Sequence, residues 1–431
     1  MAQAQLVNKQ SPGYAQSIHP DRYNHVHRPY TPDEVLEYRN SVMNQLVIPT
    51  AGAEKMWERS THGPVMVAIG AITGNQSVEY TKNGILTYNG GWQDAFDNNL
   101  QRETFPDRGF LTWDSPAAAA QRIVNANMTA ERIHHRRGDY SIDWHLPIVT
   151  DIEAGWGSNA MAYNVTRAAV MAGSAAVHIE DQLSDVRRCG HLANKTVLPE
   201  LQHYNKLVAV RFAMDVLGVP GVVINRTDAK SAAYISNDID PEDHRYIDFD
   251  KGKTPDHGLY HFNGGIEAVI QRGIRMAPVA EVFWFETNKL DIGEAREVIQ
   301  GVREKAPWVI GAYNWSPSVN QQGLDPKAVA EFRDEAAAEG FMYQFITVGG
   351  SHAVQHASHL LSLAVARESY PAYVEHQRRE FASAPDGYDF TEHQERAGNG
   401  EYDRLEEIVT RAKVASSMVG KGGTSEGFGK G

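Results

Sequence analysis

The sequence predicts an α/β protein whose core is a (β/α)8 barrel of the TIM type, with insertions and a helical C-terminal extension. Eight short apolar runs alternate with helical patterns along the 431-residue chain. The runs are apolar throughout, which is typical of parallel strands buried on both faces. Eight such strands separated mostly by helices favour a barrel over an open sheet. The predicted strands are Val65–Ala71, Ile85–Asn89, Pro147–Asp151, Ala175–Glu180, Gly221–Arg226, Val282–Glu286, Trp308–Asn314 and Met342–Thr347.

Helical patterns follow most of these strands. One of them has clear boundaries, because Asp325 caps its start and Gly340 ends it. An earlier helix starts at Thr31, where a proline takes the first helical position and Glu34 completes a capping box. The predicted helices after the strands are Ala160–Met171, Pro199–Leu217, Gly265–Arg272, Ile292–Glu304, Pro326–Glu339 and His352–Arg367.

These patterns divide the chain into three parts. Residues 1–64 form an N-terminal arm and helices, and residues 65–367 form the catalytic barrel. Insertions at about 101–146 and 228–263 separate the second strand from the third and the fifth from the sixth. Residues 368–431 form a helical extension that ends in a glycine-rich tail, which we expect to be flexible.

Composition excludes several classes of function. The formal charge of −13 repels phosphate backbones, so we expect no nucleic-acid partner. No run of 18 apolar residues is present, and the first ten residues do not resemble a signal peptide, so we expect no membrane association. The single cysteine cannot form an internal disulfide, which fits a reducing compartment. We therefore expect a cytoplasmic enzyme with a small-molecule substrate.

Polar side chains follow the strands at the end where barrel enzymes place their chemistry. Asp151, Glu153 and Glu180 come directly after the third and fourth predicted strands. Carboxylates with no cysteine and few histidines nearby favour Mg²⁺, or Mn²⁺, over zinc. Seven of the eight strand ends carry polar groups, and the residues at the other strand ends include Tyr88, Gly90, Gly91, Trp92, Arg226, Glu286, Asn314, Ser316, Ser318 and Thr347.

Two further features suggest the chemistry of the site. Cys189 has two arginines before it and His191 two positions after it, a setting expected to depress the thiol pKa and to allow proton transfer near neutral pH. Arg226 is placed to hold a carboxylate bidentately. The uncharged groups of Asn314 and Thr347, with two serines between them, suit a second carboxylate.

A collinear set of motifs between Arg28 and about residue 400 resembles the isocitrate lyase family, within the superfamily that includes phosphoenolpyruvate mutase and 2-methylisocitrate lyase. The motifs are TGNQ, GWQ, FPD, PIVTDIEAGWG, HIEDQ, RRCGH, RTDA, WFET, NWSPS and FITVGG. The resemblance implies Mg²⁺-dependent cleavage of isocitrate to glyoxylate and succinate. It also implies a homotetramer whose subunits exchange the helices after the eighth strand.

The resemblance implies a role for each matching residue. Asp151 would bind Mg²⁺ directly, and Asp107, Glu153 and Glu180 would hold its waters. Tyr88 would be the base, and Cys189, assisted by His191, would protonate the succinate carbanion. Arg188 joins the catalytic set. The glyoxylate half would contact Gly90, Gly91, Trp92 and Arg226, Gly190 would contact substrate, and the succinate half would contact Glu286, Asn314, Ser316, Ser318 and Thr347.

Several positions depart from the family pattern. Both lysines of the usual KKCGH are arginine, namely Arg187 and Arg188, and Gly90 replaces a serine whose hydroxyl would contact glyoxylate. We expect Trp315 to take room from the succinate half and Val348 to make room there. The remaining departures are Ala193-Asn194 and Gly349. A 2-methylisocitrate lyase or a related 2-hydroxy-acid lyase giving pyruvate and succinate is the alternative, and a barrel that serves only for binding or assembly is a third reading.

Overall fold

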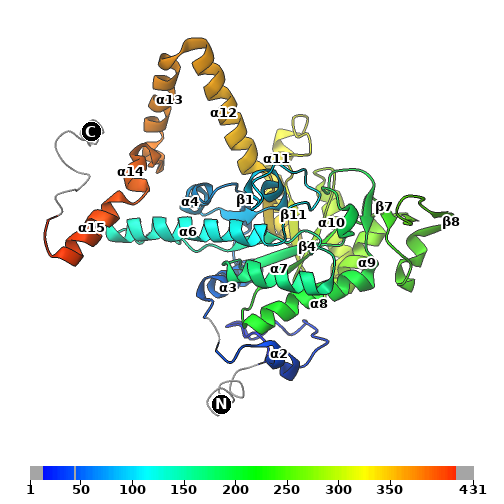
Figure 1. Ribbon diagram of the computed structural model, residues 1–431. Helices are drawn as coiled ribbons and strands as arrows, with labels where there is room; N and C mark the ends of the chain where they lie inside the picture. The colour runs from blue at the N-terminus through cyan, green and yellow to red at the C-terminus, as the bar shows by residue number, and fades with distance from the viewer. Residues whose placement is uncertain (1–12, 43–44, 414–431) are drawn as a thin grey trace.

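The computed structural model describes residues 13–42 and 45–413, and its centre is a closed barrel of eight parallel strands (Figure 1). The order around the barrel is β1-β12-β11-β10-β6-β4-β3-β2, which confirms the predicted fold class. Each predicted strand is present with ends shifted by at most two residues. The barrel strands are β1 (Met66–Gly70), β2 (Leu86–Asn89), β3 (Ile148–Asp151), β4 (Ala176–Glu180), β6 (Val222–Thr227), β10 (Val282–Phe285), β11 (Ile310–Asn314) and β12 (Phe341–Ile346).

Helices surround the barrel, and all six helices predicted after the strands are present. The segment 101–146, which the sequence presents as an insertion, contains the 22-residue helix α6, and this helix packs against α4 and α7 as part of the helical layer. The helices around the barrel are α4 (Gly74–Lys82), α6 (Ser115–Arg136), α7 (Asn159–Met171), α8 (Glu200–Leu217), α9 (Ile266–Met276), α10 (Ile292–Arg303) and α11 (Pro326–Glu339).

A second, four-stranded sheet lies beside the barrel, and its order is β5-β7-β9-β8. Three of its strands come from the segment 228–263, namely β7 (Ala232–Ile235), β8 (Ile247–Lys253) and β9 (Tyr260–Phe262). The fourth, β5 (Lys195–Val197), pairs in parallel with β7. Because β5 follows directly after residues 184–194, this sheet anchors the far end of the segment that carries Cys189.

The N-terminal residues are fastened to the lower end of the barrel, opposite the carboxyl ends of the strands. The predicted capping box of Thr31 and Glu34 is present at the start of α2 (Pro32–Tyr38). The fully buried Asp215, near the end of α8, accepts hydrogen bonds from the Arg28 Nε (2.7 Å), the Tyr30 hydroxyl (2.6 Å) and the Ala15 amide (2.8 Å). The helix α3 (Val47–His62) then leads into β1.

Aromatic rings fill the barrel beneath the carboxyl ends of its strands. The rings of Tyr88 and Trp284 pack on Phe345, with centroids 5.1 and 4.9 Å away. All three side chains are buried. The barrel is therefore a packed core rather than a channel, and polar chemistry is confined to its upper end.

The C-terminal helices leave the barrel as an arm. The helix α12 (Gly349–Glu368) projects away after β12, and α13 (Tyr370–Ala382) turns back toward α14 (His393–Arg396) and α15 (Asn399–Thr410) (Figure 1). Ion pairs tie this return to the barrel, since Arg396 contacts Glu79 of α4. The predicted glycine-rich tail lies outside the described residues. Within the described part of the chain, no helix has the length and apolar character needed to cross a membrane.

Candidate active site

Four carboxylates at the upper end of the barrel surround one buried guanidinium. The Nε of Arg187 lies 2.5 Å from both Glu153 Oε2 and Glu180 Oε1, and its Nη1 contacts Asp107. Arg187 is only 2% exposed. Asp151 lies next to the same cluster, at the end of β3. The structure thus brings together the four carboxylates that the sequence singles out, with Arg187 between three of them.

The turn after β3 sets the directions of these side chains. The Glu153 amide donates to Asp151 Oδ1 (2.7 Å), and the backbone of Glu153 has a φ of 52°, in the left-handed region that is strained for most side chains. The Gly91 amide donates to Asp151 Oδ2 (3.0 Å). A Cβ on Gly91 would lie 2.8 Å from that same oxygen, so only glycine allows the turn after β2 to approach the end of β3 so closely.

When all its carboxylates are ionised, the cluster has more negative charges than its arginines have positive charges. Burial raises the pKa of Glu180 to about 7 and that of Glu153 well above its usual value, despite the adjacent Arg187. Burial also opposes ionisation of Asp151, but His178, Arg187 and Arg226 outweigh it, and the pKa of Asp151 is lowered. A further positive charge would therefore be accommodated here.

The donor atoms suit a hard divalent cation. Glu153 Oε1 is buried without a hydrogen-bond partner, and Glu153 Oε2 and Glu180 Oε2 are partnered only through ion pairs with Arg187 and Arg226. All the candidate ligands are oxygens, which Mg²⁺ and Mn²⁺ prefer. Across residues 13–42 and 45–413, no three His, Cys, Asp or Glu side chains are already grouped as a metal site, and Arg187 stands between Asp107 and the two glutamates. The oxygen ligands suit the ion, and Arg187 would have to move out of the cluster when the ion binds.

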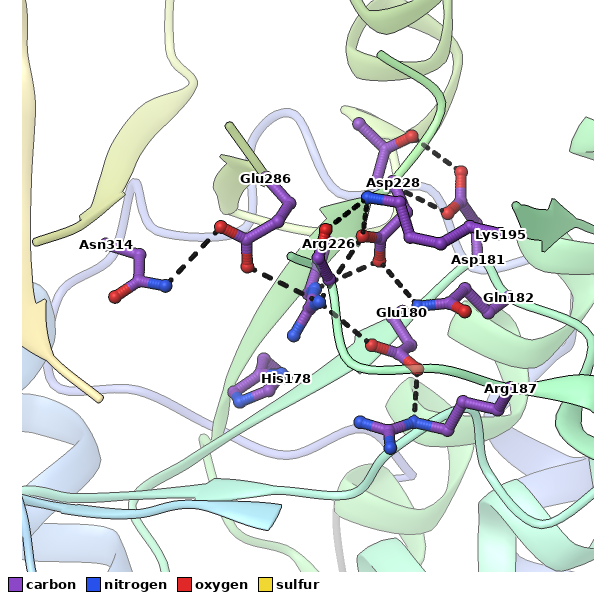
Figure 2. Close-up of polar contacts among 12 residues, drawn as sticks. His178, Glu180, Asp181, Gln182, Arg187, Lys195, Arg226, Asp228, Glu286 and Asn314 are labelled. Atoms are coloured by element: carbon purple, nitrogen blue, oxygen red, sulfur yellow. Dashed lines mark hydrogen bonds and ion pairs between the residues drawn. The ribbon is translucent and has the colours of Figure 1, made fainter. Parts of the chain in front are cut away.

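Arg226 is fixed at the end of β6 by carboxylates on two sides (Figure 2). Its Nη2 lies 3.3 Å from Glu180 Oε2 and 3.4 Å from Glu286 Oε2, and its Nε lies 3.1 Å from Asp228 Oδ2. The guanidinium stacks over Trp284 at 4.3 Å from the ring centroid. Arg226 is therefore a pre-oriented cation, as recognition of a carboxylate requires.

Cys189 differs from the expectation drawn from its neighbours in sequence. Burial raises the pKa of its thiol to about 12, and the negative charge of Asp107 adds to this effect. The expectation of a depressed pKa was wrong, because the guanidinium of Arg187 is committed to the carboxylate cluster. A thiol with such a pKa keeps its proton at neutral pH, so Cys189 is set up to donate a proton rather than to act as a thiolate.

This pKa predicts slow alkylation of Cys189. Iodoacetamide reacts with the thiolate, so at pH 7.5 we expect the rate to be about a thousandfold below that of free cysteine. The rate should rise about tenfold for each pH unit while the protein stays folded, because a pKa of about 12 lies above the whole range. Intact-mass spectrometry measures it, since the chain has one cysteine. A rate that levels off near pH 8 would contradict the raised pKa.

The groups expected around the succinate half lie on neighbouring strands. Glu286, after β10, lies 3.4 Å from His191 Nε2 and accepts from Asn314 Nδ2 (3.4 Å). Ser316 is buried, and its Oγ accepts the Ser318 amide at 3.1 Å, whereas Ser318 itself is exposed. The structure thus joins His191, Glu286 and Asn314 directly, and it places Ser318 at the rim.

Trp315 does not lie where the sequence comparison suggested. Its ring packs edge-on against Phe332 of α11 (4.9 Å), and its Nε1 donates to Gln321 Oε1 (2.8 Å). The expectation that Trp315 takes room from the succinate half was therefore wrong, because alternate residues along a strand end face opposite sides. Its neighbours Asn314 and Ser316 are buried.

Gly90 has no room for the serine that the family usually carries. A Cβ here would lie 2.5 Å from the Tyr88 ring and even closer to Gln93 Oε1. We expect Gly90→Ser to lower kcat/KM and to cost about 1–3 kcal/mol of stability, as overpacking does. Steady-state kinetics and thermal unfolding measure the two effects. Improved turnover at unchanged stability would show instead that the missing hydroxyl limits the enzyme.

Two buried residues that the sequence did not single out, His178 and Gln93, contact the expected site. The Nε2 of His178 lies 2.8 Å from the Tyr88 hydroxyl and 3.6 Å from Asp151 Oδ2. The Nε2 of Gln93 donates to the Thr347 carbonyl, which bridges the ends of β2 and β12. Both residues lie inside the quoted motifs HIEDQ and GWQ, so membership of a motif was the available signal.

Comparison with known proteins agrees with this geometry. A sequence profile described as the isocitrate lyase family matches residues 16–254 and 246–428. The chain is 39% identical to the isocitrate lyase of Salmonella typhimurium over 418 residues, which cover 94% of this chain and 95% of that protein. It is 37% identical to the isocitrate lyase of Halalkalibacterium halodurans over 407 residues and 38% identical to isocitrate lyase 1 of Mycobacterium tuberculosis over 409 residues, with 94% of each chain covered in both cases.

Solved structures support the fold. The chain matches an oxaloacetate acetylhydrolase with a TM-score of 0.55 at 17% identity, covering 79% of this chain and 97% of that one. It matches a 2,3-dimethylmalate lyase with a TM-score of 0.53 at 19% identity, covering 80% and 99%. These identities are too low to carry an activity across. The profile match and the relatives that align over nearly the whole chain show that the protein belongs to the isocitrate lyase family.

Proposed function

We propose that this protein cleaves isocitrate into glyoxylate and succinate. The observation that carries the proposal is the meeting of Cys189, Arg226 and the carboxylate cluster at one end of the barrel. Relatives named isocitrate lyase, 37–39% identical over 94% of the chain, support it. The third reading, a barrel without catalysis, leaves this costly concentration of buried charge unexplained.

The proposed cofactor is Mg²⁺, with Mn²⁺ as a substitute. Asp151 would bind it directly, and Asp107, Glu153 and Glu180 would hold its waters. When bound, the ion would supply a Lewis acid that stabilises negative charge on the glyoxylate half. The buried Glu153 Oε1, which lacks a hydrogen-bond partner, and the raised pKa values of Glu153 and Glu180 support this assignment.

The chain's own residues would then divide the work. The glyoxylate half would be held by Arg226 and by the backbone at Gly91 and Trp92. The succinate half would be held by five side chains, namely those of Glu286, Asn314, Ser316, Ser318 and Thr347. The substrate hydroxyl would lose its proton to Tyr88 Oη as the carbon–carbon bond breaks and the aldehyde forms. Burial raises the pKa of Tyr88 well above its usual value and lowers that of His178 to about 4, so the phenol keeps its own proton at rest, and His178 Nε2, 2.8 Å from that oxygen, would take it only as the substrate hydroxyl is deprotonated.

The electron pair of the broken bond would remain on the succinate carbon. The Sγ–H of Cys189 would donate its proton to that carbon, with the His191 and Glu286 pair beside it. The raised thiol pKa supports this role, since the proton is present at neutral pH until a strongly basic carbanion forms.

The rival substrate, 2-methylisocitrate, is favoured by one observation. Trp315 lies outside the pocket, so nothing offsets the room that Val348 makes beside Thr347. A methyl group is worth only about 1–3 kcal/mol of discrimination, so this point alone is outweighed by the relatives. The test is kcat/KM for both substrates with the carbonyl product identified. Pyruvate release at higher efficiency than glyoxylate release would overturn the assignment.

We also propose a homotetramer in the cytoplasm. The arm formed by α12 and α13 buries little of itself, and large side chains such as Tyr370 (81% exposed) and Leu360 (50% exposed) lie on it. A second copy of the chain would cover this apolar surface. Light scattering at assay concentration should give four times the 47.8 kDa chain mass, and a monomeric active species would contradict the proposal.

A further inference from the structure

The segment 184–194, which carries Cys189, is held at the peptide groups on both sides of the thiol. The Arg188 amide donates to Gln182 Oε1 (3.1 Å), and Gln182 Nε2 donates back to the Arg188 carbonyl (2.8 Å). On the other side, Lys195 Nζ donates to the Gly190 carbonyl (2.6 Å). Two side chains outside the segment therefore fix the backbone that positions the thiol.

Both of these side chains meet at one carboxylate, Asp228 (Figure 2). Asp228 Oδ1 lies 2.8 Å from Lys195 Nζ, and Oδ2 accepts from Gln182 Nε2 at 3.1 Å. The same carboxylate lies 3.1 Å from Arg226 Nε. Asp228, Gln182 and Lys195 are fully buried, so these contacts are shielded from water and are strong.

The carboxylate is itself held from below. The Asp228 amide donates to Asp181 Oδ1 (2.9 Å), and Asp181 Oδ2 pairs with Arg272 (2.8 Å). Burial would raise the pKa of Asp228, but Arg226 and Lys195 outweigh it and the pKa is lowered. Asp228 is therefore a fixed negative charge. It lies between Arg226 and the two side chains, Gln182 and Lys195, that hold the segment 184–194.

The segment also touches Arg226 directly. A Cβ on Gly190 would lie 2.6 Å from Glu286 Cγ and closer still to Arg226 Nη2. Only glycine lets the backbone rest on the guanidinium in this way. Two separate routes, one through Gly190 and one through Asp228, therefore connect Arg226 with the position of the thiol.

We infer that Gln182, Lys195 and Asp228 are positioning residues that hold the Cys189 thiol over the site and tie its position to Arg226. The inference rests on the proposed function only for the role of the thiol as a proton donor. A lysine kept merely for stability would satisfy Asp228 without also binding a carbonyl of the cysteine segment. Loss of the grip should free the segment, expose the thiol to water and return its pKa toward the usual range.

The experiment measures alkylation of the single cysteine by iodoacetamide in the full-length protein without substrate. In Lys195→Met, which keeps the length but removes the donors, the rate should rise at least about tenfold, because the exposed thiol forms more thiolate. Gln182→Met removes no charge and should act in the same direction, so it carries the test if Lys195→Met does not fold. The matched control is Arg211→Met, which breaks a buried ion pair with Glu281 at the lower end of the barrel.

Kinetics provide a second readout that a purely structural role would not give. In Lys195→Met and Gln182→Met, kcat should fall about tenfold to a hundredfold through misplacement of the thiol, with a much smaller change in the KM for isocitrate. Arg211→Met should lose thermal stability while its alkylation rate stays at the wild-type value. Alkylation at the wild-type rate in both Lys195→Met and Gln182→Met, or equal acceleration in Arg211→Met, would overturn the inference. Failure of the wild-type protein to cleave isocitrate would instead overturn the proposed function, because alkylation needs no substrate.

Discussion

Cys189→Ala should fold normally and lose about 10²–10⁴-fold in kcat, the usual contribution of a general acid. The structure gives the reason, since burial keeps the proton on the thiol until a stronger base appears beside it. Cys189→Ser should be almost as poor, because a hydroxyl is a weaker acid than even this thiol. Turnover of isocitrate under saturating conditions is the measurement.

The control for the cysteine variants is their stability. Serine is nearly isosteric with cysteine, alanine only truncates the side chain at Cβ, and neither change removes a contact of the segment with Gln182 or Lys195, so the thermal midpoint should stay close to that of the wild type. A variant that folds like the wild type and keeps wild-type turnover would mean that another group protonates the carbanion. His191 would then be the next candidate, because it lies beside Glu286 in the same pocket.

Removal of divalent metal should abolish turnover, and Asp151→Asn should weaken Mn²⁺ binding by at least about tenfold. Asp151 ends a buried strand, and its pKa is lowered by surrounding positive charge, whereas burial raises the pKa of Glu153 and Glu180. Asparagine keeps the shape and removes the charge. Electron paramagnetic resonance of Mn²⁺ gives the affinity without depending on activity.

Asp97→Asn is the matched control for Asp151→Asn. Asp97 lies in the exposed part of the turn after Trp92, so its loss should leave Mn²⁺ affinity unchanged. Full activity after exhaustive chelation, or equal affinity in Asp151→Asn and wild type, would remove the metal from this cluster. Recovery of turnover on adding Mg²⁺ back to the chelated wild type is the expected positive result.

The barrel was predictable because its strands are short, mainly apolar runs that lack the strict alternation of a half-buried strand. Each of them is recognised from a few residues, and no contact distant in sequence is needed to interpret it. The helix α6 was not identified, because the long segment 101–146 between two strands was interpreted as an insertion rather than as the place of a barrel helix. Packing against α4 and α7, which the sequence does not display, stabilises it.

The residue types of the site were predictable, but the directions of its side chains were not. Arg187 and Cys189 are near neighbours in sequence, yet the guanidinium turns into the carboxylate cluster, and burial, together with Asp107 from a distant part of the chain, raises the thiol pKa. The direction of the Trp315 side chain was equally unpredictable, since its ring packs outward on Phe332 while the residues on either side are buried at the site. Electrostatics and pocket shape depend on these directions, and chain order does not reveal them.

The hydrogen bonds between Asp215 and the N-terminal residues have a consequence for the evolution of this protein. Asp215 and its partners Arg28 and Tyr30 lie at the opposite end of the barrel from the carboxyl ends of the strands. Substitutions there alter how tightly the protein is held together without touching the groups that handle the substrate. Stability gained by substitutions at that end can offset the stability lost through the replacements that a new substrate preference would require at the other end. The two ends of the barrel can therefore evolve independently of each other.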